Sequence, residues 1–377
     1  METRLVTRSE QDARFMARAL VLASKGVGWT SPNPPVGAVV VKDGRIVGEG
    51  YHHRAGLVHA EVEALRRAGS AARGAALYVT LEPCNHAGRT PPCCEAILAA
   101  GIARVIAGTR DPNPVTNGRG FARLRRAGLT VTSGVLERQA KALIAPFEHA
   151  MRRGLPLVTA KIAQSLDGKI ATVSGESRWI SSSRARRLTH EQRQASDAIL
   201  VGVNTVIQDD PLLSVRGLRH RRSRPVKVIV DSRLRCPVRA RCLSPASAAP
   251  TIIATTAARN ARWAALERRG AEILQFPAKR GRVPLRQLCR QLARRGLQSV
   301  MIEGGGELLA AALSERLVGQ VRFFVAPLLI GGQAAPGSVA GRGIARLSQA
   351  ARLADLNVRK VGPDLCVEAR VVYPGGR

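Results

Sequence analysis

The segment AALYVTLEPCNHAGRTPPCCEAILAAG, residues 75–101, predicts a strand, a polar loop and a helix in direct succession. Its first part is an apolar run of strand length, and its last part follows two prolines and ends at a glycine, as helices often do. Cys84 and Cys93 flank the polar loop, and Cys94 follows directly. Cysteines at the two ends of a loop are typical of a metal site in a chain without a disulfide framework.

Strand and helix signals alternate around this segment. Residues 36–52 predict a β-hairpin with Asp43-Gly44 as its turn. Residues 13–26 and 58–69 predict helices that end at a glycine, and residues 103–112 predict a further strand. This order of elements indicates an α/β layered domain.

A second domain is expected after a boundary near residue 150. There a charged helix passes through Gly154 and Pro156 into a new strand, and strand-like and helix-like segments alternate again. No internal repeat is visible. We therefore expect two domains of ordinary size, residues 1–150 and 151–377, each with its own core.

The charge of the chain is unusual. The 377 residues contain 59 Lys plus Arg against 27 Asp plus Glu, a formal net charge of +32. Such an excess favours a nucleic-acid partner. The alternative is a general preference for arginine on a solvated surface, because the arginines are spread along the chain and only residues 217–225 form a dense run. Aromatic residues, at 3%, are too few for base-stacking platforms, so we expect no nucleic-acid partner.

Other classes of protein are excluded by the hydrophobic pattern. The longest apolar runs, residues 37–41 and 323–332, have the length of strands rather than of membrane spans. The N-terminus alternates in charge and lacks an apolar signal core. We expect no membrane association and a cytoplasmic location. There, seven cysteines serve as metal ligands, catalytic groups or small buried side chains.

An upstream histidine completes a candidate zinc site. His59 and Glu61 stand at the start of a predicted helix in HAEVEAL. A catalytic zinc takes three protein ligands and leaves a fourth position to water, whose pKa falls to about 7. His59, Cys84 and Cys93 supply three ligands, while Glu61 can move protons. H-x-E…P-C…C is the signature of zinc-dependent base deaminases, although the cysteine spacing here is P-C-x8-C instead of P-C-x-x-C.

Alternatives to this interpretation remain open. Cys94 is expected to be a small buried residue of the helix, and its use as the ligand in place of Cys93 is the alternative. A structural site would need a fourth ligand, for which His86 is the nearby candidate. A protein that used zinc only for folding would have no need of Glu61.

Further motifs in both halves identify a family. The first half contains PNPPVG (32–37), HAEVEAL (59–65) and TLEPCNHAGRTPPC (80–93), and the second contains KIAQSLDGKIA (161–171) and IEGGGELL (302–309). Together they resemble the bacterial bifunctional deaminase–reductases of riboflavin biosynthesis, over nearly the whole chain. The resemblance implies a cytidine-deaminase-like α/β/α layer domain followed by a dihydrofolate-reductase-like α/β domain.

The resemblance also implies a pair of reactions. The first is zinc-dependent hydrolytic deamination of a 2,5-diamino-6-ribosylamino-pyrimidinone 5′-phosphate, and the second is NADPH-dependent reduction of its ribosyl group to ribityl. Glu61 would be the catalytic acid and base, with Zn²⁺ on His59, Cys84 and Cys93. Arg89 would meet the ribose phosphate. The implied pyrimidine contacts are Asn33, His52 and His86.

The resemblance also implies roles for residues of the reductase domain. The implied substrate contacts are Ser177, Arg193, Leu213, Arg216 and Glu303, of which the two arginines suit a phosphate. The implied cofactor contacts are Ala163, Trp179, Thr205, Asp209, Ser232, Gly305, Gly306, Glu307, Leu308, Leu309, Ala310 and Ala311. Ala163 departs from relatives that have glycine there, and no proton donor is assigned to the reduction.

The glycine turn at 304–306 is the clearest local signal of the second domain. A predicted strand ends in three glycines and runs into a helix, where backbone amides can hold a phosphate. It is not the G-x-G-x-x-G of a Rossmann domain, and a tight turn without a ligand is the alternative.

Alternatives to this function remain open. The chain could be a nucleic-acid base deaminase with a basic appended domain, or a member of the family in which one of the two domains is inactive. The partner we expect is a small phosphorylated pyrimidine, and a homo-oligomer is an open alternative to a monomer.

Overall fold

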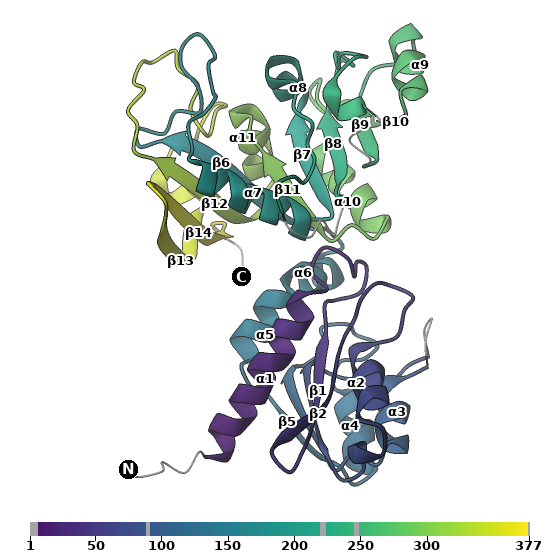
Figure 1. The fold of residues 1–377 in the computed structure, drawn as a ribbon. Coiled ribbons are helices and arrows are strands. Elements are labelled where there is room, and N and C mark those ends of the chain that lie inside the picture. Colours follow the sequence, from purple (N-terminus) through teal and green to yellow (C-terminus); the bar gives the residue numbers. More distant parts are fainter. Residues whose placement is uncertain (1–6, 88–90, 219–223, 245–248, 376–377) are drawn as a thin grey trace. The chain divides into compact units, whose positions relative to one another are not determined.

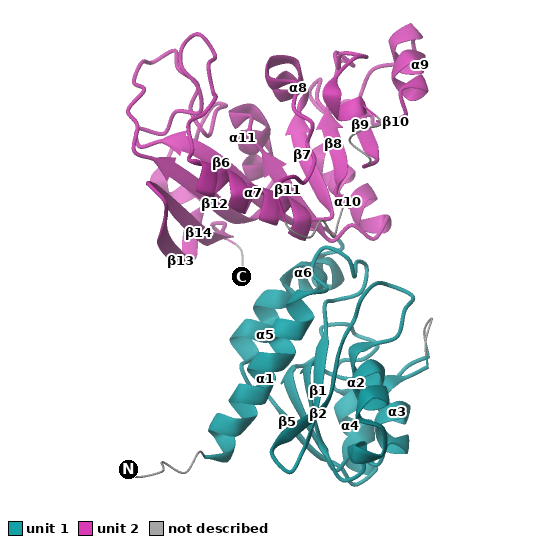
Figure 2. Cartoon of the chain, in the orientation of Figure 1, with its two compact units in different colours: residues 1–154 teal, residues 155–377 magenta. Residues whose placement is uncertain are grey.

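The computed structural model describes residues 7–87, 91–218, 224–244 and 249–375. The chain forms two compact units, Met1–Gly154 and Leu155–Arg377 (Figures 1 and 2). Each unit is built around its own sheet with helices on it, so the predicted α/β class is confirmed. Among the described residues, no helix combines the length and the apolar character that crossing a membrane requires.

The first unit has a five-stranded mixed sheet in the order β2-β1-β3-β4-β5. β1 pairs antiparallel with β2 and β3, while β3, β4 and β5 are parallel. The predicted hairpin is present, and its turn residues Asp43 and Gly44 have φ values of 48° and 72°, as a type I′ turn requires. The strands are β1 (Gly37–Lys42), β2 (Arg45–Tyr51), β3 (Ala76–Leu81), β4 (Arg104–Thr109) and β5 (Thr130–Ser133).

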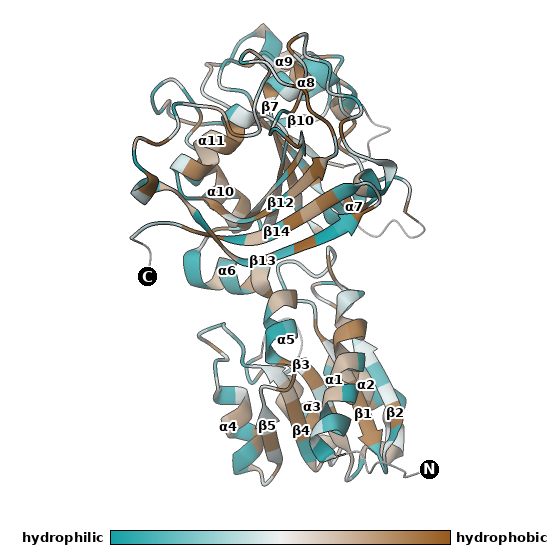
Figure 3. Cartoon of the chain, turned by 90° about the vertical axis from the view of Figure 1, so that its left-hand side faces the viewer, coloured by the Kyte–Doolittle hydropathy of each residue, from teal (hydrophilic) through white to brown (hydrophobic). Residues whose placement is uncertain are grey.

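Helices cover both faces of this sheet. Val39 and Tyr78 pack on one face with Phe15 of α1, whereas the neighbouring Val40 and Val79 pack on the other face with α2, α3 and α4. Both faces are therefore buried, and β1 contains the continuous apolar run of residues 38–41, which ends at Lys42 (Figure 3). The helices are α1 (Arg8–Ser24), α2 (Ala60–Ala68), η1 (Gly69–Ala72), α3 (Cys93–Ala99), α4 (Arg119–Arg126), α5 (Glu137–Leu143) and α6 (Ala145–Arg153).

Helix α1 starts five residues earlier than the predicted start at Ala13. Thr7 is its N-cap, and its hydroxyl accepts a hydrogen bond from the Glu10 backbone at 3.3 Å while the Glu10 carboxylate accepts from the Thr7 backbone at 2.8 Å. This capping box satisfies helix donors that would otherwise lack partners. The spacing Thr-x-x-Glu was the signal in the sequence.

The second unit has a nine-stranded sheet in the order β10-β9-β8-β7-β11-β6-β12-β14-β13. The strands from β10 to β12 in this order are parallel. β14 pairs antiparallel with β12 and β13, and this last hairpin was not predicted. The strands are β6 (Leu157–Ser165), β7 (Ala198–Gly202), β8 (Val226–Val230), β9 (Thr251–Thr255), β10 (Ala271–Gln275), β11 (Ser299–Glu303), β12 (Val318–Ala326), β13 (Arg352–Val361) and β14 (Asp364–Val372).

Two apolar cores lie on the two faces of the parallel strands. Leu200 and Ile302 belong to one core, and their neighbours Ile199 and Met301 belong to the other. Burial on both faces explains why these strands are continuous apolar runs in the sequence. The helical elements are α7 (Ser183–Ala195), α8 (Val203–Asp209), η2 (Arg241–Leu243), α9 (Ala261–Arg268), α10 (Leu285–Arg294), α11 (Gly306–Ser314) and η4 (Leu347–Gln349).

Strand β12 ends at Ala326, although the apolar run predicted a strand through Gly332. Pro327 follows at once and has no N–H to donate to a neighbouring strand. Leu328 and Leu329 beyond it are 44% and 77% exposed. The apolar pattern therefore overestimated the length of the strand, because residues 327–332 lie beyond its end.

The core of the first unit gives a matched pair of stability predictions. Leu124 on α4 is fully buried, whereas Leu57 is 46% exposed. Leu124→Ala should lower the free energy of unfolding of this unit by about 2–5 kcal/mol, because a buried cavity is left. Leu57→Ala should change it by no more than about 0.5 kcal/mol. Hydrogen exchange of the β3 and β4 amides measures both, and equal effects would contradict the packing described.

Candidate functional site

Three candidate ligands converge in the first unit. His59 is the N-cap residue of α2 and makes no side-chain capping bond, Cys84 follows β3, and Cys93 is the first residue of α3. The Nδ1 atom of His59 lies 3.1 Å from Sγ of Cys93 and 3.6 Å from Sγ of Cys84. All three ligand atoms lie within 4.8 Å of one another.

The pKa values of the two thiols are shifted in the directions expected of a site that can bind a cation. A hydrogen bond from the Cys93 thiol lowers the pKa of Cys84 to about 4, and His59 and the Cys93 backbone amide add to this effect. The same contact, together with burial, raises the pKa of Cys93. A thiolate beside a second thiol and an imidazole is the donor set that zinc prefers.

Glu61 lies next to this cluster on the first turn of α2. Its side chain is buried, with 4% exposure. Burial raises the pKa of the carboxyl above its ordinary value, with the Cys84 thiolate as a further cause. A buried carboxyl with a raised pKa is a better proton acceptor than an exposed one, as a group that transfers protons in catalysis needs to be.

Cys94 is separate from the three candidate ligands. It is fully buried, and its thiol donates to the carbonyl oxygens of Pro83 at 3.6 Å and Gly120 at 3.8 Å. Burial raises its pKa to about 12. These contacts describe a small protonated core residue rather than a metal ligand.

Glu82, which the sequence analysis did not single out, holds the segment that carries Cys84. Its buried carboxylate accepts hydrogen bonds from the backbone amides of Asp111, Gly118 and Phe121 at 3.2, 2.9 and 3.2 Å. A Cβ on Gly120 would lie only 2.1 Å from the carbonyl oxygen of Pro83. Glu82 stands in the TLEPC motif, so its place just before the cysteine was the available signal.

The predicted substrate contacts of the first unit, the pyrimidine contacts Asn33, His52 and His86 and the phosphate contact Arg89, are placed as follows. Asn33 and His52 are hydrogen-bonded to each other at 3.0 Å, and the His52 ring lies edge-on to the His59 ring with centroids 5.2 Å apart. His86 is half-buried, and its Nδ1 lies 3.4 Å from the Thr116 hydroxyl. Arg89 lies outside the described residues.

The second unit has a large cavity of about 1220 Å³. Residues at the carboxyl ends of β6, β7, β8 and β11 line it, as expected for a ligand site on a parallel sheet. All predicted substrate contacts of this unit line the cavity, and so do all its predicted cofactor contacts except Ala310.

The glycine turn forms part of this cavity. β11 ends at Glu303, Gly304 and Gly305 have φ values of 66° and 74°, and α11 begins at Gly306. A Cβ on Gly306 would lie 2.7 Å from the carbonyl oxygen of Gly337. The predicted strand–turn–helix is thus present, and the first amides of α11, which lack helical partners, belong to cavity-lining residues.

A buried charge cluster lies on the same wall. Nε and Nη2 of Arg193 donate to the two Glu303 oxygens at 2.5 and 2.6 Å, and Nη1 donates to the Ser214 carbonyl at 2.9 Å. The Arg193 guanidinium is therefore committed within the protein, whereas Arg216 is exposed at the cavity. Lys161, which received no role from the sequence, lies beside this pair, and burial lowers its pKa. Its position in the motif K-x-A-x-S-L-D-G-K was the available signal.

Two family models match the chain. One is described as the cytidine and deoxycytidylate deaminase zinc-binding region and matches residues 9–109. The other is described as the RibD C-terminal domain and matches residues 156–367. The two matches fall in the first and second unit, respectively.

Several RibD proteins are similar to this chain in sequence or structure over nearly its whole length. The riboflavin biosynthesis proteins RibD of Aquifex aeolicus and Escherichia coli are each 42% identical, covering 95% of this chain and 98% of the relative. A solved structure of Acinetobacter baumannii RibD has a TM-score of 0.84 at 36% identity, covering 97% of this chain and 100% of that one. A Thermotoga maritima diaminohydroxyphosphoribosylaminopyrimidine deaminase/5-amino-6-(5-phosphoribosylamino)uracil reductase has a TM-score of 0.85 at 35% identity, with the same coverage.

The two adjacent cysteines give a matched test of the metal site. Cys93→Ser should lose bound zinc, because a hydroxyl replaces a soft thiolate ligand. Cys94→Ser should keep zinc at the wild-type stoichiometry, because its thiol donates to the carbonyl oxygens of Pro83 and Gly120. Metal analysis of the two purified variants shows which cysteine binds zinc. Loss of zinc from the Cys94 variant alone would show that Cys94, and not Cys93, is the ligand.

Proposed function

The chain belongs to the RibD family of riboflavin-biosynthesis proteins, and we propose that each unit carries one of the two reactions of a bifunctional deaminase–reductase. The first unit removes ammonia from 2,5-diamino-6-ribosylamino-pyrimidinone 5′-phosphate, and the second reduces the ribosyl group to ribityl with NADPH. The observation that supports this most directly is the convergence of His59, Cys84 and Cys93 beside the buried Glu61.

In the first unit, His59, Cys84 and Cys93 would hold zinc. Zinc bound there supplies a Lewis acid that makes a water nucleophilic at neutral pH. Glu61 accepts the proton that the attacking water loses and delivers it to the pyrimidine ring nitrogen. It then carries a proton to the departing amine, so that a C–N bond breaks, a C=O bond forms and ammonia leaves. Its raised pKa suits both directions of transfer.

The remaining residues of the first unit bind the substrate in this proposal. Asn33, His52 and His86 recognise the pyrimidine, and Arg89 binds the ribose phosphate through a charge-assisted contact. Glu82 keeps Cys84 in place through three backbone amides.

In the second unit, the cavity would bind NADPH and the deaminated product. NADPH supplies the hydride for the ribosyl carbon. The amides of the turn at Gly305 and Gly306 bind cofactor phosphate, with the other predicted contacts around it. Arg216 binds the substrate phosphate, while Arg193 orients the Glu303 carboxylate through its bidentate contact.

The cysteines support a cytoplasmic location in the same proposal. All seven are free thiols, as is usual in a reducing compartment.

The proposed function is tested by following both products on one zinc-loaded sample. The diamino-pyrimidinone ribosyl phosphate is supplied with NADPH, and ammonia and the absorbance of NADPH are recorded separately. We expect ammonia release followed by NADPH oxidation. Ammonia without NADPH oxidation would leave the second unit without its proposed reaction, and neither signal from folded, metal-bound protein would contradict the proposal.

Glu61→Gln isolates the proton-transfer step. The amide cannot accept or release the proton, so ammonia release should fall by about 10²–10⁴-fold. Zinc content should stay at the wild-type level, because Glu61 is not one of the three ligands. NADPH oxidation with the deaminated product is the internal control and should be unchanged. Retained deamination would remove Glu61 from the mechanism.

Gly306→Ala tests the cofactor site of the second unit. The new methyl group would lie 2.7 Å from the Gly337 carbonyl oxygen, which displaces the turn. The KM for NADPH should rise by about tenfold, corresponding to about 1.4 kcal/mol of binding energy. Ammonia release should be unchanged. A KM at the wild-type value would exclude the turn as a cofactor contact.

A further inference from the structure

Two loops of the second unit are joined to each other beside its cavity. One loop follows β6 and the other follows β12 (Figure 1). The backbone amide of Leu166 donates to the carbonyl oxygen of Leu328 at 2.8 Å. Further along, the amide of Ser338 donates to the carbonyl oxygen of Gly168 at 3.0 Å. Residues 328–340 are called the β12 segment below, and its far end lines the cavity.

Asp167 of the first loop binds two backbone amides of the β12 segment. Its carboxylate accepts hydrogen bonds from the amides of Ile330 at 3.1 Å and Gly331 at 2.7 Å. The Ser165 hydroxyl donates to the same carboxylate at 2.5 Å. The hydrogen bond from Ser165 and those from the two amides lower the pKa of Asp167 to about 2, so the side chain is an anion at neutral pH. Asp167 is exposed and does not line the cavity.

Lys169 binds carbonyl groups of the same segment. Its ammonium group donates to the carbonyl oxygens of Gly332 at 2.8 Å and Ala335 at 3.0 Å. The next backbone amide, that of Ile170, donates to the Pro336 carbonyl at 3.0 Å. Lys169 does not line the cavity either. A carboxylate and an ammonium group two residues apart therefore bind the amides and the carbonyls of one short stretch of backbone.

The far end of the β12 segment packs on the glycine turn before α11. The amide of Ala340 donates to the carbonyl oxygen of Gly306 at 3.2 Å. A Cβ on Gly306 would lie 2.7 Å from the carbonyl oxygen of Gly337 and 3.1 Å from the Ala340 side chain. All three residues line the cavity. Movement of the segment would therefore change the surroundings of the turn whose amides bind cofactor phosphate in the proposed function.

We propose that Asp167 and Lys169 are positioning residues of the cofactor site, which hold the β12 segment against the glycine turn without touching the cofactor. The inference rests on the proposed reductase function. Exposed loop backbone opens easily unless side chains bind it, and these two side chains bind the segment from outside the cavity. NADPH binds the form in which the segment is in place, so its apparent affinity falls with the fraction of molecules in that form.

Equilibrium binding of NADPH to Asp167→Ala and Lys169→Met tests the proposal, with the fluorescence of bound NADPH as the signal. Each variant should raise the Kd by about tenfold, which corresponds to a segment that is in place in about a tenth of the molecules. Asp167→Asn keeps an acceptor oxygen and should bind NADPH more tightly than Asp167→Ala. A Kd at the wild-type value in both Asp167→Ala and Lys169→Met would overturn the proposal.

Steady-state kinetics with the deaminated product separate positioning from a direct role in the reduction. The KM for NADPH should rise together with the Kd in both variants. The kcat should stay within about twofold of the wild-type value, because saturating NADPH restores the form in which the segment is in place. A fall in kcat without a change in Kd would overturn the proposal.

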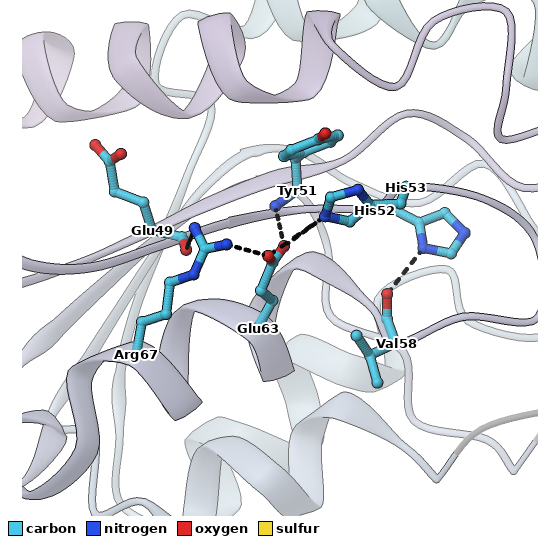
Figure 4. Close-up of polar contacts among 7 residues, drawn as sticks. All are labelled: Glu49, Tyr51, His52, His53, Val58, Glu63 and Arg67. Carbon is cyan, nitrogen blue, oxygen red and sulfur yellow. Dashed lines mark hydrogen bonds and ion pairs between the residues drawn. The ribbon is translucent and has the colours of Figure 1, made fainter. Parts of the chain in front are cut away.

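Glu63 of the first unit gives a matched control (Figure 4). Its carboxylate also accepts from a backbone amide, that of Tyr51 at 2.9 Å, and from Arg67 at 2.5 Å. Glu63→Ala removes a similar contact between a carboxylate and the backbone, but outside the unit that contains the cavity. The Kd for NADPH should stay at the wild-type value. A rise equal to that of Asp167→Ala would overturn the proposal, because the loss would not depend on the β12 segment.

Hydrogen exchange of the NADPH-free chain provides a readout that needs neither cofactor nor turnover. In Asp167→Ala and Lys169→Met, the amides of residues 330–340 should exchange at least about tenfold faster than in the wild type. Saturating NADPH should slow them again. Exchange at the wild-type rate in both variants would overturn the proposal. A wild-type chain in which these amides are protected but which binds no NADPH would instead contradict the proposed function, so the two failures are distinguishable.

Discussion

The proximity of two thiols and an imidazole limits how much negative charge the site in the first unit can carry. The ligand atoms of His59, Cys84 and Cys93 lie within 4.8 Å of one another. Two thiolates cannot both be charged at that distance without a cation. The pKa of Cys84 is accordingly lowered while that of Cys93 is raised. A bound zinc ion would deprotonate both thiols and resolve this conflict. The polar contacts of Glu82 and the burial of Glu61 and Cys94 are arranged around the same point.

The two units use the same architecture for different chemistry. In both, residues with a proposed functional role lie at the carboxyl ends of parallel strands, Cys84 after β3 in the first unit and Glu303 at the end of β11 in the second. The first site gathers soft ligands and a buried acid. The second gathers a cavity, a glycine turn and a paired Arg193–Glu303. Each unit therefore accounts for one of the two proposed reactions.

Local signals in the sequence predicted the parts of the fold that depend on neighbouring residues. The Asp43-Gly44 turn, the glycine turn before α11 and the α/β alternation are all present. The hairpin β13–β14 was missed because its first strand is mostly exposed and a register shift between Ala354 and Asn357 interrupts its alternation. Lys161 and Glu82 were missed because their roles arise from tertiary burial.

The coordination of zinc in the intact chain is the most direct test of the account. X-ray absorption at the zinc edge counts sulfur and lighter ligands separately, because Zn–S distances are about 2.3 Å and Zn–N distances about 2.0–2.1 Å. The account predicts one zinc per chain with two sulfur ligands, one imidazole and one further light atom. Three or four sulfur ligands, or a chain that binds no zinc when folded, would contradict it.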